Sequence, residues 1–322
     1  MKTSIQKFFF LLVICVVFTL NLNARVLTVA SQSSPQVAEY NTIQASHDAA
    51  QSGDTIYVYP SLIAYKGAVI TKKMIIIGNG FTKVNDYSDC SKILNTETLK
   101  FDAGSEGSVI SSLSGNFSIS VNASNVLVQR CKLESFIVGT NITQVSIINS
   151  VVSSISISDN SFVSIQNNII NNGQATAIGI GTNGYGLIKN NIISNSGAMT
   201  IYGYSASVIN NIIFSAVDYY GNPSSYYFAA AATILNSPTN VDKSTWFVDF
   251  ANQNYHLKAG SPGIGAGKNN IGMATDLGIY GGEYPFIDDG APNLPTIYFM
   301  NIPSTASQKD GLSVEIKAKS NN

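Results

Sequence analysis

The stretch Val163-Ser-Ile-Gln-Asn167-Asn-Ile-Ile decides the fold, because close copies of it recur along the chain. Three copies begin at Val145, Gly186 and Ser207, and a weaker copy begins at Val126. The aligned positions 130, 149, 167, 190 and 210 are separated by 19, 18, 23 and 20 residues. A period near 20 is too short for a propeller blade, which needs roughly 40 to 45 residues, and fits one coil of a parallel β-helix.

Apolar and polar residues alternate within the repeats. In Ser153-Ser-Ile-Ser-Ile157-Ser every second residue is Ile, which places Ile on one face of a strand and Ser on the other. We expect the Ile face to line the interior of each coil and to stack on the same position of the next coil. A helical structure is not expected, because the region is rich in Asn, Ser and Gly and its apolar period is two.

An Asn occupies the same place in four copies, at Asn149, Asn167, Asn190 and Asn210. Asn tolerates the left-handed backbone of a coil corner, and stacked Asn side chains can hydrogen-bond from coil to coil. We therefore interpret these four residues as a structural ladder. Their neighbours Asn168, Asn191 and Asn211 are expected to mark the same bend from the outside.

The N-terminus is typical of a secretory signal peptide. Lys2 and Lys7 precede an apolar run from Phe8 to Leu20, and Ala24 offers a small residue for cleavage. The run is shorter than the roughly 20 residues that span a bilayer, so a retained anchor is the less favoured alternative. No later stretch is predicted to cross a membrane. We expect an exported protein, secreted or at the cell surface, whose mature chain starts near Arg25.

A short amphipathic helix is predicted between Tyr40 and Gly53, with Ile43, His47 and Ala50 on one face. Such a helix would cap the first coil, because the open edge of a solenoid would otherwise pair with other chains. Strands are predicted to follow at 55–60 and 68–80.

Three stretches of the sequence carry a family resemblance. They are YNTIQASHDAAQSGDTIYVYP from Tyr40, FVDFANQNYHLKAGSPGIGAG from Phe247 and TDLGIYGGEYPF from Thr275. They resemble the opening and the closing segment of secreted right-handed parallel β-helix proteins of the pectin-lyase-like superfamily, Bacteroidetes type. The usual Ser-Pro-Ala-Ile-Asp-Ala-Gly appears here as Ser261-Pro-Gly-Ile-Gly-Ala-Gly267. The resemblance implies an all-β, single-stranded right-handed parallel β-helix, and it does not select one activity.

Three parts of the chain are expected: a signal peptide at 1–24, the β-helix with its cap and closing segment at 25–290, and a tail at 291–322. In the tail, 296–302 and 312–318 alternate like strands around a turn at Lys309-Asp-Gly311, which predicts a β-hairpin. We expect this hairpin to dock on the side of the solenoid. The alternative is the remnant of a sorting or anchoring element.

Charge is scarce, since only 11% of the residues are Asp, Glu, Lys or Arg, against roughly 25% in ordinary soluble domains. The 18 basic and 19 acidic residues leave a net charge of -1, which argues against nucleic acid as a partner. Enzymes that resemble this fold use clustered carboxylates or a carboxylate with Arg or Lys. Arg130, Lys132 and Glu134 are the best catalytic candidates by residue type, although a surface ion pair among them is the simpler interpretation.

One feature suggests ligand binding. Tyrosines crowd the end of the repeat region, and the candidate ligand-binding residues there are Tyr202, Tyr204, Asp218, Tyr219 and Tyr220. Exposed rings on a rigid solenoid could stack on sugar rings, with Asp218 as a polar partner. The alternative is that the rings cover the last coils beneath the closing segment.

No metal or cofactor is predicted. The chain lacks Cys/His spacing for zinc, and the acidic loops at 86–89 and 288–289 lack ordered calcium spacing. Export permits a disulfide between Cys90 and Cys131, but two distant cysteines make no framework, and the apolar setting of Cys131 favours a buried thiol. His47 and His256 are expected to be structural.

The function predicted from the sequence is an exported, non-catalytic scaffold that binds or adheres to a glycan or polysaccharide. The alternative is a polysaccharide lyase or glycoside hydrolase, and a third option is a structural component of the cell envelope. The sequence leaves the oligomeric state open.

Overall fold

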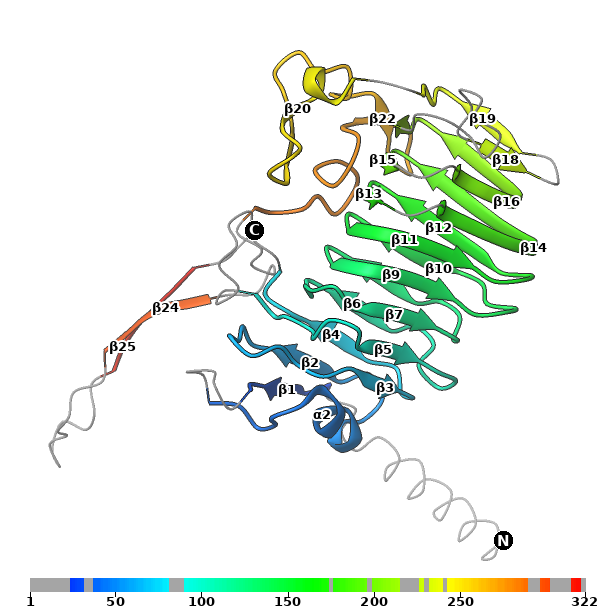
Figure 1. Ribbon diagram of the computed structural model, residues 1–322. Helices are drawn as coiled ribbons and strands as arrows, with labels where there is room; N and C mark the ends of the chain where they lie inside the picture. The colour runs from blue at the N-terminus through cyan, green and yellow to red at the C-terminus, as the bar shows by residue number, and fades with distance from the viewer. Residues whose placement is uncertain are drawn as a thin grey trace, which may run out of the picture.

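The computed structural model describes residues 24–31, 37–80, 90–173, 176–195, 199–214, 226–228, 232–239, 242–288, 296–301 and 314–319. The chain forms a right-handed parallel β-helix of about 7 turns, which confirms the predicted fold class (Figure 1). Most of the predicted signal peptide lies outside the described residues. Among the described helices, none has the length and the apolar content needed to cross a bilayer.

Within the described part of the chain, nineteen parallel-paired strands build the coils. They are β1 (Val26–Val29), β2 (Thr55–Val58), β3 (Ala68–Ile70), β4 (Ile75–Ile77), β5 (Thr98–Phe101), β6 (Val109–Ser111), β7 (Ser118–Val121), β8 (Leu127–Gln129), β9 (Lys132–Val138), β10 (Val145–Ile148), β11 (Val151–Ile157), β12 (Phe162–Gln166), β13 (Ile169–Asn172), β14 (Thr176–Lys189), β15 (Ile192–Asn195), β16 (Met199–Ile209), β17 (Ile212–Ile213), β18 (Tyr226–Phe228) and β19 (Thr233–Leu235). Each strand pairs with the equivalent strand of the next coil.

The interior is a stack of aliphatic side chains at equivalent positions. One column runs through Leu27, Ile56, Ile76, Ile110, Val128, Ile147, Ile165, Ile188 and Val208, each fully buried and paired in register with the next. Burial stabilises each of these side chains by about 1.5–3 kcal/mol. The column reaches Ile234 in the last described coil, where the side chain is 43% exposed. The predicted inward Ile column is confirmed.

A buried polar ladder runs beside the aliphatic column. Asn168, Asn191 and Asn211 are all 0% exposed. Each Nδ2 donates to a backbone carbonyl of the preceding coil, at 2.8–2.9 Å, and the side chains bond to one another from coil to coil. The expectation that these residues mark the bend from the outside is therefore wrong. They point inward, where their amides bond to the carbonyls of Ile147, Ile165 and Ile188, so these buried polar groups are satisfied.

The first coil is capped by the helix α2 (Ile43–Ala49), which confirms the predicted cap, although α2 is shorter than predicted. Thr42 accepts a hydrogen bond from the Ala45 N–H at its start. At its end, Lys72 Nζ donates to the carbonyls of residues 47, 48 and 50. Buried His47 accepts from the Thr71 N–H through Nε2, so it joins the cap to the coil as a structural residue.

The chain leaves the last coil and returns along the side of the solenoid (Figure 1). We call residues 242–288 the closing segment. It contains a 3-10 turn, η2 (Lys243–Thr245), and the antiparallel pairs β20 (Phe247–Asp249) with β21 (Asn254–Leu257) and β22 (Gly267–Lys268) with β23 (Ala274–Thr275).

The tail forms the predicted hairpin. β24 (Thr296–Asn301) pairs antiparallel with β25 (Glu315–Lys319). In Figure 1 the two strands point away from the coils, so the expected docking on the side of the solenoid is not observed for them.

Cys90 and Cys131 are both buried and unpaired, which confirms the buried thiol predicted for Cys131. Burial raises the pKa of the Cys131 thiol to about 12. At pH 8 about one thiol in 10⁴ is therefore the reactive thiolate. We expect Cys131 to resist a maleimide reagent at pH 8 in the native protein and to react fully in denaturant, as measured by mass spectrometry. Labelling of the native Cys131 at pH 8 would contradict its burial.

Candidate functional site

The corners that follow β6, β8, β10, β12, β14, β16 and β19 form a column of left-handed residues. Positive φ angles between 47° and 62° occur at Ser112, Arg130, Asn149, Asn167, Asn190, Asn210 and Asn236. Asn is the non-glycine residue that adopts this conformation most readily, which explains the repeated Asn. Bonds between corners are few and long, such as Asn190 Nδ2 to Asn167 Oδ1 at 3.4 Å. The coil-to-coil ladder predicted for these residues is therefore carried mainly by the buried Asn that follows each of them.

The corner Asn side chains hold the closing segment. Asn149 Nδ2 donates to the carbonyls of Ile279 and Gly281 at 2.9 and 2.6 Å. Asn167 Nδ2 donates to those of Asp276 and Gly278 at 3.1 and 3.2 Å. Further along, Asn190 Nδ2 donates to the Lys268 carbonyl at 2.8 Å. Asn149, Asn167 and Asn190 thus dock the closing segment, whereas Asn168 and Asn191 bond inside the coil.

The closing segment also covers an apolar stripe. The residues after each Asn pair point outward at Val151, Ile169, Ile192 and Ile212, and all four are buried. They pack in one cluster with closing-segment side chains that include Phe247, Leu277 and Ile279. Each residue of the repeated Asn-Asn-Ile-Ile therefore has its own role. The first Asn forms the corner, the second forms the internal ladder, the first Ile lies in the outer stripe, and the second Ile lies in the core.

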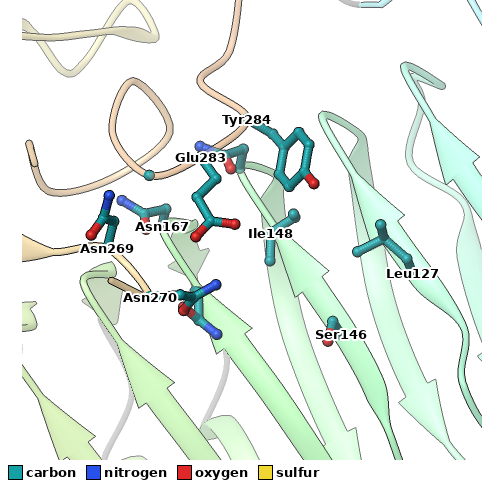
Figure 2. Close-up of a pocket in the computed structure, with 11 residues that line it drawn as sticks. Leu127, Ser146, Ile148, Asn167, Asn269, Asn270, Glu283 and Tyr284 are labelled. Carbon is teal, nitrogen blue, oxygen red and sulfur yellow. The ribbon is translucent and has the colours of Figure 1, made fainter. Parts of the chain in front are cut away.

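A groove of about 190 Å³ lies where the closing segment meets the outer face of β8, β10 and β12 (Figure 2). The floor residues from these strands are Leu127, Ser146, Ile148 and Gln166, and the wall residues from the closing segment are Asn269, Asn270, Glu283 and Tyr284. Neighbouring strands are spaced by about 4.8 Å, so the groove runs across three coils along the solenoid axis. The Tyr284 side chain is 46% exposed at its rim.

The lining combines apolar and uncharged polar groups. Leu127, Ile148 and the Tyr284 ring provide apolar surface, and Ser146, Gln166 and Asn270 provide hydroxyl and amide groups. Among the described residues that line the groove, Glu283 is the one with a formal charge. Sequence reasoning missed this site because Tyr284 and Glu283 lie more than 110 residues from the strands that they face.

The three catalytic candidates are not directed at one point. Arg130 Nε donates to the Tyr284 carbonyl at 3.2 Å, and Lys132 Nζ donates to Gln253 Oε1 at 2.8 Å. Glu134 accepts from the Ser153 hydroxyl. The ion pair expected among them is wrong, since none of the ion pairs between described residues joins Glu134 to either cation. Burial lowers the pKa of both Arg130 and Lys132, consistent with their position beneath the closing segment.

Tyr202 and Tyr204 lie in β16 and are 43% and 36% exposed. They flank Gly203, whose φ of 151° lets the strand turn where a Cβ would overlap the Ile180 carbonyl. The candidates Asp218, Tyr219 and Tyr220 lie outside the described residues. Neither Tyr202 nor Tyr204 lines the groove.

A stacked aromatic pair lies on the outer face of β12 and β14. The Phe162 and Tyr185 rings are 5.2 Å apart between centroids and tilted by only 4°. The pair was missed, although the repeat alignment carries the signal: Phe162 precedes Val163 and Tyr185 precedes Gly186, so the two are neighbours in adjacent coils.

A second hollow, of about 500 Å³, lies beside η2 and β20 and brings Lys243 and Lys258 near Asp249. Each charge already has a protein partner: Lys243 Nζ donates to Ser194 Oγ at 2.6 Å, and Lys258 Nζ donates to the Ser244 carbonyl at 2.7 Å. Asp249 accepts from Asn252 through N and Nδ2. These contacts fasten the start of the closing segment.

His256 has a structural position, as expected. Its Nε2 lies 2.8 Å from Asp288 Oδ2, and its ring stacks on the Tyr280 ring. The Tyr280 hydroxyl donates to Asp288 Oδ1 at 2.7 Å, and burial followed by this carboxylate raises the pKa of Tyr280. The cluster ties β21 to the end of the closing segment.

Comparison of the chain with protein-family models, with curated proteins and with solved structures found no match. The β-helix is therefore established by the structure alone. The resemblance to pectin-lyase-like proteins stays a prediction, and the function has to be argued from the groove.

Proposed function

We propose that this protein is an exported β-helix scaffold that binds a glycan in the groove without cleaving it. The observation that carries the proposal is the groove lining, in which the Tyr284 ring and two aliphatic side chains alternate with uncharged amides and a hydroxyl. Sugars present apolar C–H faces and a rim of hydroxyl groups, so they need both kinds of contact. Most ligand sites likewise combine apolar walls with a few polar groups that fix orientation.

Binding is favoured over cleavage because the groove offers one carboxylate. Glycoside hydrolases generally place two carboxyl groups on either side of the scissile bond. Glu283 supplies one, and the nearby cations Arg130 and Lys189 bond to closing-segment carbonyls. The lyase or hydrolase alternative therefore has no second reacting group among the described residues of the groove.

The groove is also built on a rigid support. Its floor consists of strands whose side chains are fixed by the stacked core, and its wall is held by the paired amides of Asn149 and Asn167. A preformed site loses little conformational entropy when a ligand binds. This arrangement suits adhesion, in which many weak contacts to a polymer act together.

The proposal predicts that Tyr284→Ala weakens glycan binding about tenfold or more, because it removes the largest apolar surface of the groove. Binding of the mature chain to a glycan array would be measured with wild type, Tyr284→Ala and Tyr202→Ala. Tyr202 is a matched control, since its exposure is 43% against 46% for Tyr284 and it lies outside the groove.

Cleavage of the bound polysaccharides would be assayed in parallel by the appearance of new reducing ends. We expect binding without cleavage. Loss of binding in Tyr202→Ala alone would show that the binding site lies on β16 and not in the groove. Cleavage that is abolished by Glu283→Gln would establish the enzyme alternative instead.

A further inference from the structure

The charge and hydrogen-bonding capacity of the groove define what kind of glycan it accepts. The Glu283 carboxylate points into the groove between Asn167, Asn270 and Ile148 (Figure 2). None of the hydrogen bonds or ion pairs between described residues involves this carboxylate. Glu283 is exposed, so its carboxylate is accessible to a ligand in the groove.

The cations at the borders of the groove do not neutralise Glu283. Arg130 Nε donates to the Tyr284 carbonyl, and Lys189 Nζ donates to the Asn269 carbonyl, both at 3.2 Å. Both side chains approach the backbone of the closing segment and neither is part of the groove lining. The formal charge that a ligand meets inside the groove is therefore negative.

The side-chain amides of Asn149 and Asn167 have no N–H group left for a ligand. Asn149 and Asn167 each donate two hydrogen bonds from Nδ2 to closing-segment carbonyls, which uses both N–H groups of each. Gln166 Nε2 donates to Ser164 Oγ at 2.6 Å. The wall amides of Asn269 and Asn270 and the Ser146 hydroxyl can still donate to a ligand, so the formal charge sets the selectivity: a uronic acid would place its carboxylate against the Glu283 carboxylate.

We infer that the groove selects glycans that carry free amino groups, that is, oligosaccharides or polymers of unacetylated hexosamine. This inference rests on the proposed function and specifies its ligand class. An ammonium group donates up to three hydrogen bonds and pairs with Glu283, while the sugar ring packs on Tyr284. Charge-assisted hydrogen bonds of this kind are about twice as strong as neutral ones, so the amino group dominates selectivity.

The test uses the mature chain and four probes of equal length: a glucosamine oligosaccharide, its fully N-acetylated form, an oligogalacturonate and an oligolysine. Binding would be measured by calorimetry at low and high salt. We expect the glucosamine probe to bind most tightly and to lose affinity as salt is raised, because salt screens the charge pair. Glu283→Gln is expected to weaken this probe about tenfold, to the level of the acetylated probe, and to leave the acetylated probe unchanged.

Glu134→Gln is the matched control, because Glu134 is an exposed acid on the outer face of β9 outside the groove. Equal binding of both sugar probes, unchanged in Glu283→Gln but lost in Tyr284→Ala, would overturn the inference and leave the proposed function intact. Binding of the sugar probes that is insensitive to Tyr284→Ala, or no binding of any sugar probe, would overturn the proposed function itself. Oligolysine binding as tight as glucosamine binding would show that the site recognises cationic chains in general and not amino sugars.

Discussion

Replacing Asn191 with alanine is expected to lower the free energy of unfolding by about 3–5 kcal/mol. Asn191 is fully buried, and its Nδ2 donates to the Ile165 carbonyl and to Asn211 Oδ1. Its Oδ1 accepts from the N–H and the Nδ2 of Asn168. Alanine would remove all four bonds at the centre of the ladder: the buried Asn168 N–H would lose its acceptor, and Asn168 Nδ2 and Asn211 Oδ1 would each keep one partner.

Denaturant unfolding followed by circular dichroism measures this effect. Asn116→Ala is the control, since Asn116 is exposed and its substitution is expected to change stability by less than about 0.5 kcal/mol. If Asn191→Ala were as stable as Asn116→Ala, the internal ladder would not be a source of stability.

The coils were predictable because their pattern is local. The period near 20 and the Ile/Ser alternation depend on neighbouring residues, and the alignment of Val163 with Gly186 is also the observed strand register. The capping helix was predictable for the same reason, since Thr42, Ile43 and His47 lie within one short stretch.

The direction of each Asn in a pair was not predictable from the pattern. Asn167 and Asn168 are identical residues at successive positions, and backbone φ alone decides which one turns outward. The docking of the closing segment could not be predicted from the sequence either, because the Asn149 side chain bonds to the Ile279 carbonyl, which is 130 residues away along the chain. The groove arises from that long-range contact, so its lining could not be assembled from the repeats.

Gly281→Ala is expected to release the closing segment from the coils while the β-helix stays folded. A Cβ on Gly281 would overlap the Asp276 carbonyl and press on the Asn167 amide, and neither can move without breaking the docking contacts. We expect the local opening free energy of the closing segment to fall by about 3 kcal/mol. The glycan affinity is expected to fall as well, because the wall of the groove moves with the segment.

Amide hydrogen exchange would be compared between wild type and Gly281→Ala at residues 276–282 and in β10 and β12. Gly179→Ala is the control, since nothing lies within 4 Å of a Cβ at that position in β14. Faster exchange confined to the closing segment is predicted. Unchanged exchange there, or loss of protection throughout the coils, would mean that the segment is not a separate unit docked on the corner Asn residues.

A glycan bound between the closing segment and the coils would protect the backbone on both sides of the groove. Hydrogen exchange of the mature chain, with and without partly acetylated glucosamine oligosaccharides, tests this most directly, because it locates the ligand without any substitution. We expect added protection at 146–149, at 166–167 and at 269–284, the strands and loops that line the groove. Protection confined to β16 around Tyr202 and Tyr204, with none at 269–284, would contradict it.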